Sequence, residues 1–121
     1  MSRAHNKSES LAAVLDALDR GVQPDRTMLR DAVRQTLTDL ARRAPGRSVE
    51  VRVPPFGAIQ CVEGPRHTRG TPPNVVETDP VTWALLAAGR LGWAEAVAAG
   101  RVRASGIRTD ISAFLPMIDD D

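Results

Sequence analysis

Residues 78–116 read TDPVTWALLAAGRLGWAEAVAAGRVRASGIRTDISAFLP, and this stretch decides the fold. A Thr-Asp-Pro sequence at its start is typical of a helix N-terminus, and an apolar run follows it. That helix is predicted to end at Gly89, because glycine takes the positive φ with which helices commonly stop. Residues 93–99 predict a second, alanine-rich helix that ends at Gly100.

A strand and a last short helix are predicted after these two helices. Residues 101–105 alternate charged with apolar, small or polar side chains before Gly106, and we interpret the two arginines as the solvated face of an ordinary strand. Thr109 or Asp110 can then cap a short helix that Pro116 closes. The predicted order is therefore helix, helix, strand, short helix.

This stretch resembles the sterol carrier protein family of small α+β lipid-transfer domains. In that family an Asp precedes an apolar helix that ends in Gly. A second helix with an Ala and a closing Gly follows, and then a short basic strand that ends in Gly. The residues that match this order and spacing are Asp79, Leu86, Gly89, Leu91, Ala96, Gly100, Val102 and Gly106. The chain looks most like a compact bacterial version of the domain, closely in its last third and loosely in its middle third.

Two amphipathic helices are predicted ahead of the sheet. The first has Asn6 or Ser8 as its cap and Gly21 as its stop, and the second runs from Pro24 to the breaker residues 44–46. The short link between them favours an antiparallel hairpin. The apolar residues of the first helix recur at helical spacing and are Leu11, Val14, Leu15 and Leu18.

Three strands are predicted between the hairpin and the C-terminal stretch. Residues 49–53 alternate valine with charged side chains, and the prolines that follow end this strand. Residues 56–62 form a second strand, antiparallel to the first, with apolar groups on both faces, which predicts that both faces are covered. Residues 64–73 are a polar loop rich in breakers, and 74–78 form the third strand.

The sequence thus predicts one α+β domain, since 121 residues suffice for a single core. We expect an N-terminal helical hairpin, a small, mainly antiparallel sheet, two helices, a further strand and a short C-terminal helix. The expected parts are a disordered N-terminus at 1–5, the helical hairpin at 6–45, the sterol-carrier-like core at 48–117 and an acidic tail at 118–121.

Composition excludes several classes of function. A net charge of +1 gives no field that would attract nucleic acid, and an aromatic content of 3% offers few stacking platforms. No run approaches the ~18 apolar residues of a membrane span. A single cysteine allows no intrachain disulfide, and no signal peptide is recognisable, so we expect a cytoplasmic protein.

The residues also offer no convincing catalytic centre. Cys61 lies within a strand and is interpreted as a small buried hydrophobic residue rather than a nucleophile. His67 is the one histidine outside the N-terminus, which is too few for a metal site built with Cys61. We therefore predict no enzymatic activity, no metal and no cofactor.

The resemblance implies a non-enzymatic carrier that holds a fatty acid, an acyl-coenzyme A or a sterol-like molecule between a curved sheet and the helices. Arg66 and Arg69 of the loop would then clamp a polar head group, unless they are simply solvated. The residues predicted to line the site are Trp83, Leu86, Trp93, Val97, Phe114 and Ile59.

Alternatives remain open from the sequence. Large side chains at helical spacing are also typical of an ordinary core. The small alanine side chains between residues 84 and 99 leave volume inside the domain, which either close helix packing or a ligand must fill. A second function class is a protein-interaction or accessory domain without a ligand, whose N-terminal hairpin docks on a partner or forms a homodimer.

Overall fold

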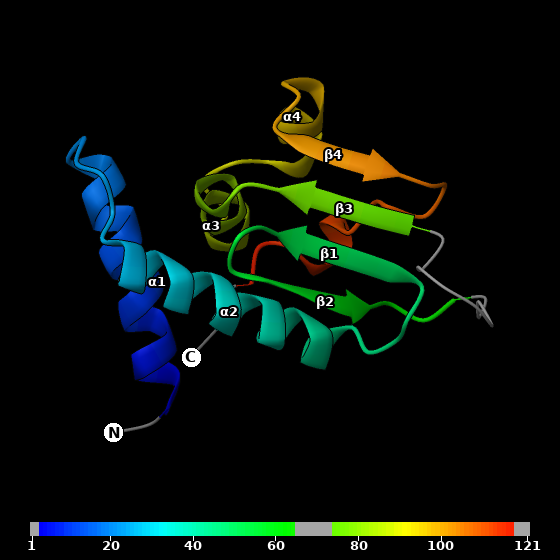
Figure 1. The fold of residues 1–121 in the computed structure, drawn as a ribbon, viewed down its shortest axis with the longest axis horizontal. Coiled ribbons are helices and arrows are strands. Elements are labelled where there is room, and N and C mark those ends of the chain that lie inside the picture. The colour runs from blue at the N-terminus through cyan, green and yellow to red at the C-terminus, as the bar shows by residue number, and fades with distance from the viewer. Residues whose placement is uncertain (1–2, 65–73, 118–121) are drawn as a thin grey trace.

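The computed structural model describes residues 3–64 and 74–117, with side chains from Glu9 onward. The predicted order of elements is confirmed (Figure 1). The helices are α1 (Arg3–Asp19), α2 (Arg26–Arg43), α3 (Pro80–Ala88) and α4 (Trp93–Ala98), followed by the 3-10 helix η1 (Ser112–Phe114). The strands are β1 (Val49–Val53), β2 (Gly57–Cys61), β3 (Asn74–Thr78) and β4 (Val102–Ser105).

The four strands form one mixed sheet in the order β2-β1-β3-β4. β1 pairs with β2 and β3 pairs with β4 in antiparallel fashion, so the sheet is mainly antiparallel, as predicted. β1 and β3 are parallel, with Val51 opposite Val76. The parallel pair arises because β2 returns the chain to the end of the sheet where β1 begins, and β3 starts there.

One face of the sheet is apolar and covered. α2, α3 and residues 111–117, which we call the C-terminal segment, pack on this inner face, and Figure 1 shows the segment passing behind β1 and β3. The main core cluster contains Val33, Leu37, Leu40, Ala44, Val49, Val51, Val53, Phe56, Cys61, Val76, Trp83, Leu86, Ala87, Ala96, Val102, Ile111 and Met117.

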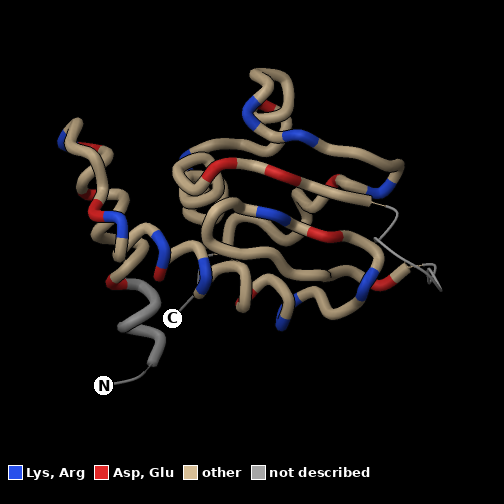
Figure 2. The backbone as a smooth tube through the Cα atoms, in the orientation of Figure 1, with Lys and Arg blue, Asp and Glu red and all other residues tan. Residues whose placement is uncertain are grey.

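The other face of the sheet is polar and faces solvent. Ala58 and Gln60 of β2 are exposed, so the prediction that both faces of this strand are covered is wrong. The reason is that the outward positions of the neighbouring strands are charged: Glu50 pairs with Gln60, and Arg52 lies between Ala58 and Glu77. Charged residues along β1 and β3 are visible in Figure 2.

α1 packs through a smaller cluster of its own. Val14 is fully buried against Ala32 of α2 and Ala84 of α3. The helix begins at Arg3, ahead of the predicted cap and inside the segment predicted to be disordered. Residues 3–5 contain no proline or glycine, so nothing in them ends the helix.

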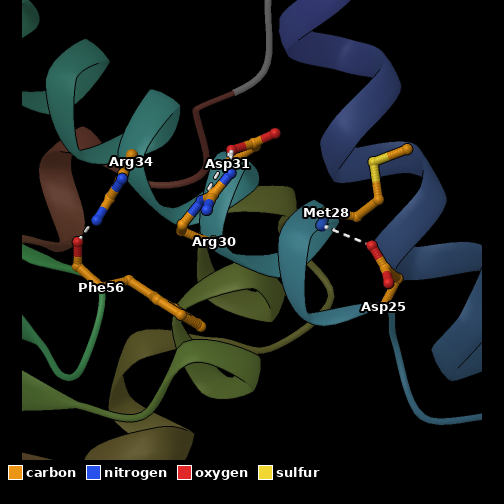
Figure 3. A network of polar contacts seen from close by, with 6 residues as sticks. All are labelled: Asp25, Met28, Arg30, Asp31, Arg34 and Phe56. Atoms are coloured by element: carbon orange, nitrogen blue, oxygen red, sulfur yellow. Dashed lines mark hydrogen bonds and ion pairs between the residues drawn. The ribbon is translucent and has the colours of Figure 1, made fainter.

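α2 begins two residues after the predicted start at Pro24, its N-terminus is capped by Asp25, and the helix is tied to the β1–β2 turn. Asp25 accepts a hydrogen bond from the backbone N–H of Met28 at 3.2 Å. Arg34 donates from Nε to the carbonyl oxygen of Phe56 at 3.0 Å (Figure 3). The guanidinium of Arg26 lies 5.1 Å from the centre of the Phe56 ring. These contacts hold α2 along β2.

The chain after β4 forms less helix than predicted. Asp110 accepts a hydrogen bond from the N–H of Ser112, but only η1 follows, because Pro116 leaves no room for further turns. The second strand is also shorter than 56–62, since Val62 has a φ of 66° that no strand accommodates. The acidic tail and most of the predicted loop lie outside the described residues.

A close backbone contact joins the connection after α2 to the end of β2. Val62 donates its N–H to the carbonyl of Ala44 at 2.7 Å and accepts hydrogen bonds from the N–H and hydroxyl of Ser48. Gly46 has a φ of +148°, and a Cβ built on it would lie 2.1 Å from the Val62 oxygen. Only glycine fits this position without a shift of the backbone.

We expect Gly46→Ala to lower the free energy of unfolding by about 3 kcal/mol, because both the conformation and the clash oppose a methyl group. Urea denaturation measures the change. Gly92→Ala is the matched control, since nothing lies within 4 Å of the added methyl. Equal free energies of unfolding for the two variants would show that position 46 does not require glycine.

Candidate functional site

Trp83 is the largest fully buried side chain, and it is hydrogen-bonded inside the core. Its indole Nε1 donates to Thr36 Oγ1 on α2 at 2.8 Å. The Thr36 hydroxyl in turn donates to a carbonyl of its own helix, Ala32 O at 2.7 Å or Val33 O at 3.0 Å. The ring is therefore fixed in place between α3 and α2.

The C-terminal segment closes the core beside α3. Ile111 is fully buried, and Met117 is nearly so. The N–H of Met117 donates to the carbonyl of Ala87 at 2.8 Å, and the N–H of Phe114 donates to that of Ile111 at 3.0 Å. Phe114 and Leu115 pack against the main core cluster while remaining partly exposed.

Five of the predicted lining residues belong to the main core cluster or pack against it. Trp83 and Leu86 belong to the main core cluster, and Ile59, Trp93 and Phe114 are partly buried against it.

Other predicted site residues lie elsewhere. Val97 is 40% exposed and is not part of the cluster, because Ala96 takes the inward position of the short helix α4. Arg66 and Arg69 lie outside the described residues.

Sequence reasoning missed three residues of this region. Leu91 packs against the main core cluster from the connection between α3 and α4, and Ile111 is buried within it. Thr36 holds the indole of Trp83. A threonine on the apolar stripe of α2 was the available signal, since a buried polar group needs a partner.

Two surface pockets within the described part of the chain lie away from these aromatic residues. One, of about 260 Å³, lies along α2 and is lined by Arg34, Gln35, Thr38, Asp39 and Arg42. The other, of about 210 Å³, lies at one end of the sheet and is lined by Pro54, Glu77, Thr78, Asp79, Gly100, Arg101 and Arg103. Most of the residues that line the two pockets are polar or charged, and neither pocket contains a large apolar side chain of the main core cluster.

Cys61 is a free cysteine, and its thiol is buried. Burial raises the pKa of the Cys61 thiol to about 11, so it stays protonated and unreactive at neutral pH. Among residues 3–64 and 74–117, no group of three or more His, Cys, Asp or Glu side chains could hold a metal ion.

Asp79 caps α3, as the sequence predicted. Its carboxylate accepts hydrogen bonds from the N–H of Thr82 at 3.0 Å and from the Thr82 hydroxyl at 2.6 Å. Burial alone would raise the pKa of Asp79, but the Thr82 hydrogen bonds, with help from its own N–H and the charge of Arg101, bring it below its ordinary value of 3.8.

Thr36→Val should lower the free energy of unfolding by about 1–2 kcal/mol, because it leaves the buried indole N–H without an acceptor at nearly unchanged volume. Thr38→Val, on the exposed side of the same helix, should change stability little. Chemical denaturation of both variants tests this, and similar losses for the two would mean that the Trp83 hydrogen bond adds no stability.

Asp79→Ala should cost about 1 kcal/mol at pH 7 through loss of the cap. Because the folded pKa of Asp79 is depressed, its stabilisation is present above 3.8 and is lost as pH falls through the folded pKa. The stability difference between wild type and variant should therefore shrink in strong acid. A difference that stays constant down to pH 2 in thermal unfolding would contradict an ionised cap.

A comparison with known protein families finds a match. A family model described as "bacterial SCP ortholog" matches residues 25–117, from the cap of α2 to the last residue of the C-terminal segment. α1 precedes the matched region. A comparison with curated proteins finds no match. None of the described helices is both long and apolar enough to cross a membrane.

Proposed function

Since this chain belongs to the family of bacterial sterol carrier protein orthologues, we propose that it binds a hydrophobic small molecule beneath the C-terminal segment. A carrier-like family of this kind suggests a lipid or another hydrophobic ligand, and such carriers are generally non-catalytic. A fatty acid, an acyl-coenzyme A or a sterol-like molecule fits the proposal. No covalent chemistry is required of the protein.

The observation that supports this proposal is a set of large apolar side chains, here called the rim residues, that pack against the buried core but stay partly exposed. The rim residues Leu91, Trp93, Phe114 and Leu115 are partly exposed while they pack against the main core cluster. A ligand chain that covers them gains the apolar area that the free protein leaves in water. Contact between the rim residues and an apolar ligand would therefore stabilise the complex.

The C-terminal segment is the element most suited to make room for a ligand. Its regular structure is limited to η1, and its backbone reaches α3 through the Met117 bond to Ala87. The inner strands β1 and β3, in contrast, each pair on both sides. Elements with few backbone hydrogen bonds open at lower free energy than central strands. Displacement of Phe114 and Leu115 would open space beside Trp83 and Leu86.

The proposal also assigns the polar head group of the ligand to Arg66 or Arg69. A guanidinium group binds a carboxylate or phosphate through paired hydrogen bonds. The two arginines lie outside the described residues.

Titration with a long-chain fatty acid should shift the amide resonances of Leu91, Trp93 and Phe114 and move the Trp93 emission to shorter wavelength. Trp93→Ala should weaken binding about tenfold, because the variant loses most of the aromatic contact area. The matched control Val97→Ala, at an exposed position of the same helix, should bind as wild type. Unmoved resonances at millimolar ligand would refute the proposal.

A further inference from the structure

The sheet has one covered edge and one open edge. α2 runs along β2 and covers that edge (Figure 1). β4, at the opposite edge, pairs only with β3 within the described part of the chain. Arg103, Ala104 and Ser105 of β4 are exposed, and Val102 is the buried exception. An open edge presents unpaired backbone N–H and C=O groups to which another strand can add.

Two arginines lie at the open edge. Arg103 of β4 projects from the outer face of the sheet, and Arg101 directly precedes β4 at the end of the sheet where α3 begins. The side chain of Arg103 forms no hydrogen bond or ion pair within the described part of the chain, and the side chain of Arg101 donates only from Nε, to Thr82 Oγ1 at 3.2 Å. Both line the 210 Å³ pocket at this end of the sheet. Guanidinium N–H groups are therefore available along the edge.

Two carboxylates, those of Glu77 and Asp79, also line this pocket. Glu77 stands on β3, with Arg52 opposite it on one side and Arg103 on the other. Asp79 accepts its hydrogen bonds from Thr82. Arg103 on β4 lies nearer the open edge than Glu77 on β3. A strand that adds to this edge therefore meets a positive charge first, which favours acidic side chains on that strand.

The inner side of the same edge is apolar. Ala104 shares the inner face with Val102, and it is exposed. Val97 of α4, the helix that packs against β4, is 40% exposed. Side chains of an added strand that point inward would meet this apolar surface, and those that point outward would meet the arginines.

From these observations we infer that the β4 edge binds an extended acidic segment of a partner protein as an additional strand. The segment alternates acidic residues, which face Arg101 and Arg103, with small apolar residues, which face Ala104 and Val97. Pairing of β4 with a second copy of itself is disfavoured, because it places the arginines of the two copies beside one another. This inference is independent of the proposed lipid site on the inner face.

The test uses the full chain and two synthetic peptides, one alternating glutamate with valine and one alternating lysine with valine. The glutamate peptide should shift the amide resonances of residues 101–105 and slow their hydrogen exchange, because strand addition gives the edge new backbone hydrogen bonds. The lysine peptide should do neither. Raising the salt concentration should weaken the glutamate peptide's binding.

Arg103→Gln should weaken binding of the glutamate peptide about threefold at low salt, in keeping with an exposed ion pair. The matched control Arg47→Gln removes an exposed arginine distant in sequence from β4 and should leave binding unchanged. The inference would be overturned by equal responses to the two peptides, by no response to either, or by shifts confined to other elements. Dimer formation through β4 would also overturn it. If the chain dimerises or responds to neither peptide, the arginines serve only to protect the edge from aggregation.

Discussion

The hydrogen bond from the Trp83 indole to Thr36 is the interaction on which the arrangement of the helices depends. A fully buried tryptophan brings a large apolar surface into the core, but its N–H must find an acceptor there. Thr36 supplies that acceptor from α2, so α2 and α3 are fixed relative to each other over one face of the sheet. The C-terminal segment then covers what these two helices leave open.

The two faces of the sheet divide the functional possibilities of the molecule. The inner face is apolar and closed by α2, α3 and the C-terminal segment, and the rim residues Trp93 and Phe114 remain partly exposed there. The outer face carries Glu50, Arg52 and Glu77 and faces solvent. The hydrophobic ligand that we propose would therefore use the inner side, and the charged partner segment that we infer would use the β4 edge.

Much of this fold could be predicted because its helix ends are encoded locally. Asp79 caps α3, and Gly89 and Gly100 take positive φ values after α3 and α4, as the spacing of these residues indicated. The parallel pairing of β1 with β3 was not predictable in the same way, since strand order depends on contacts distant in sequence. The positive φ of Val62 was also unforeseen, because no local signal marks a β-branched residue in that conformation.

The candidate site could be predicted only in part. Trp83, Leu86, Trp93, Phe114 and Ile59 were predicted to line a ligand site, and each belongs to the main core cluster or packs against it. That they line a ligand site stays a prediction. Sequence periodicity places residues on faces, however, and does not say whether the space between the faces is filled.

The most direct test of a ligand site beneath the C-terminal segment is amide hydrogen exchange at Met117, measured with and without a long-chain fatty acid. The N–H of Met117 bonds to Ala87 and reports whether the segment is closed. If the ligand displaces the segment, this amide exchanges faster in the complex while the amides of β1 stay protected. A Met117 amide whose exchange is as slow as that of β1 and unaffected by saturating fatty acid would contradict a ligand site in this position.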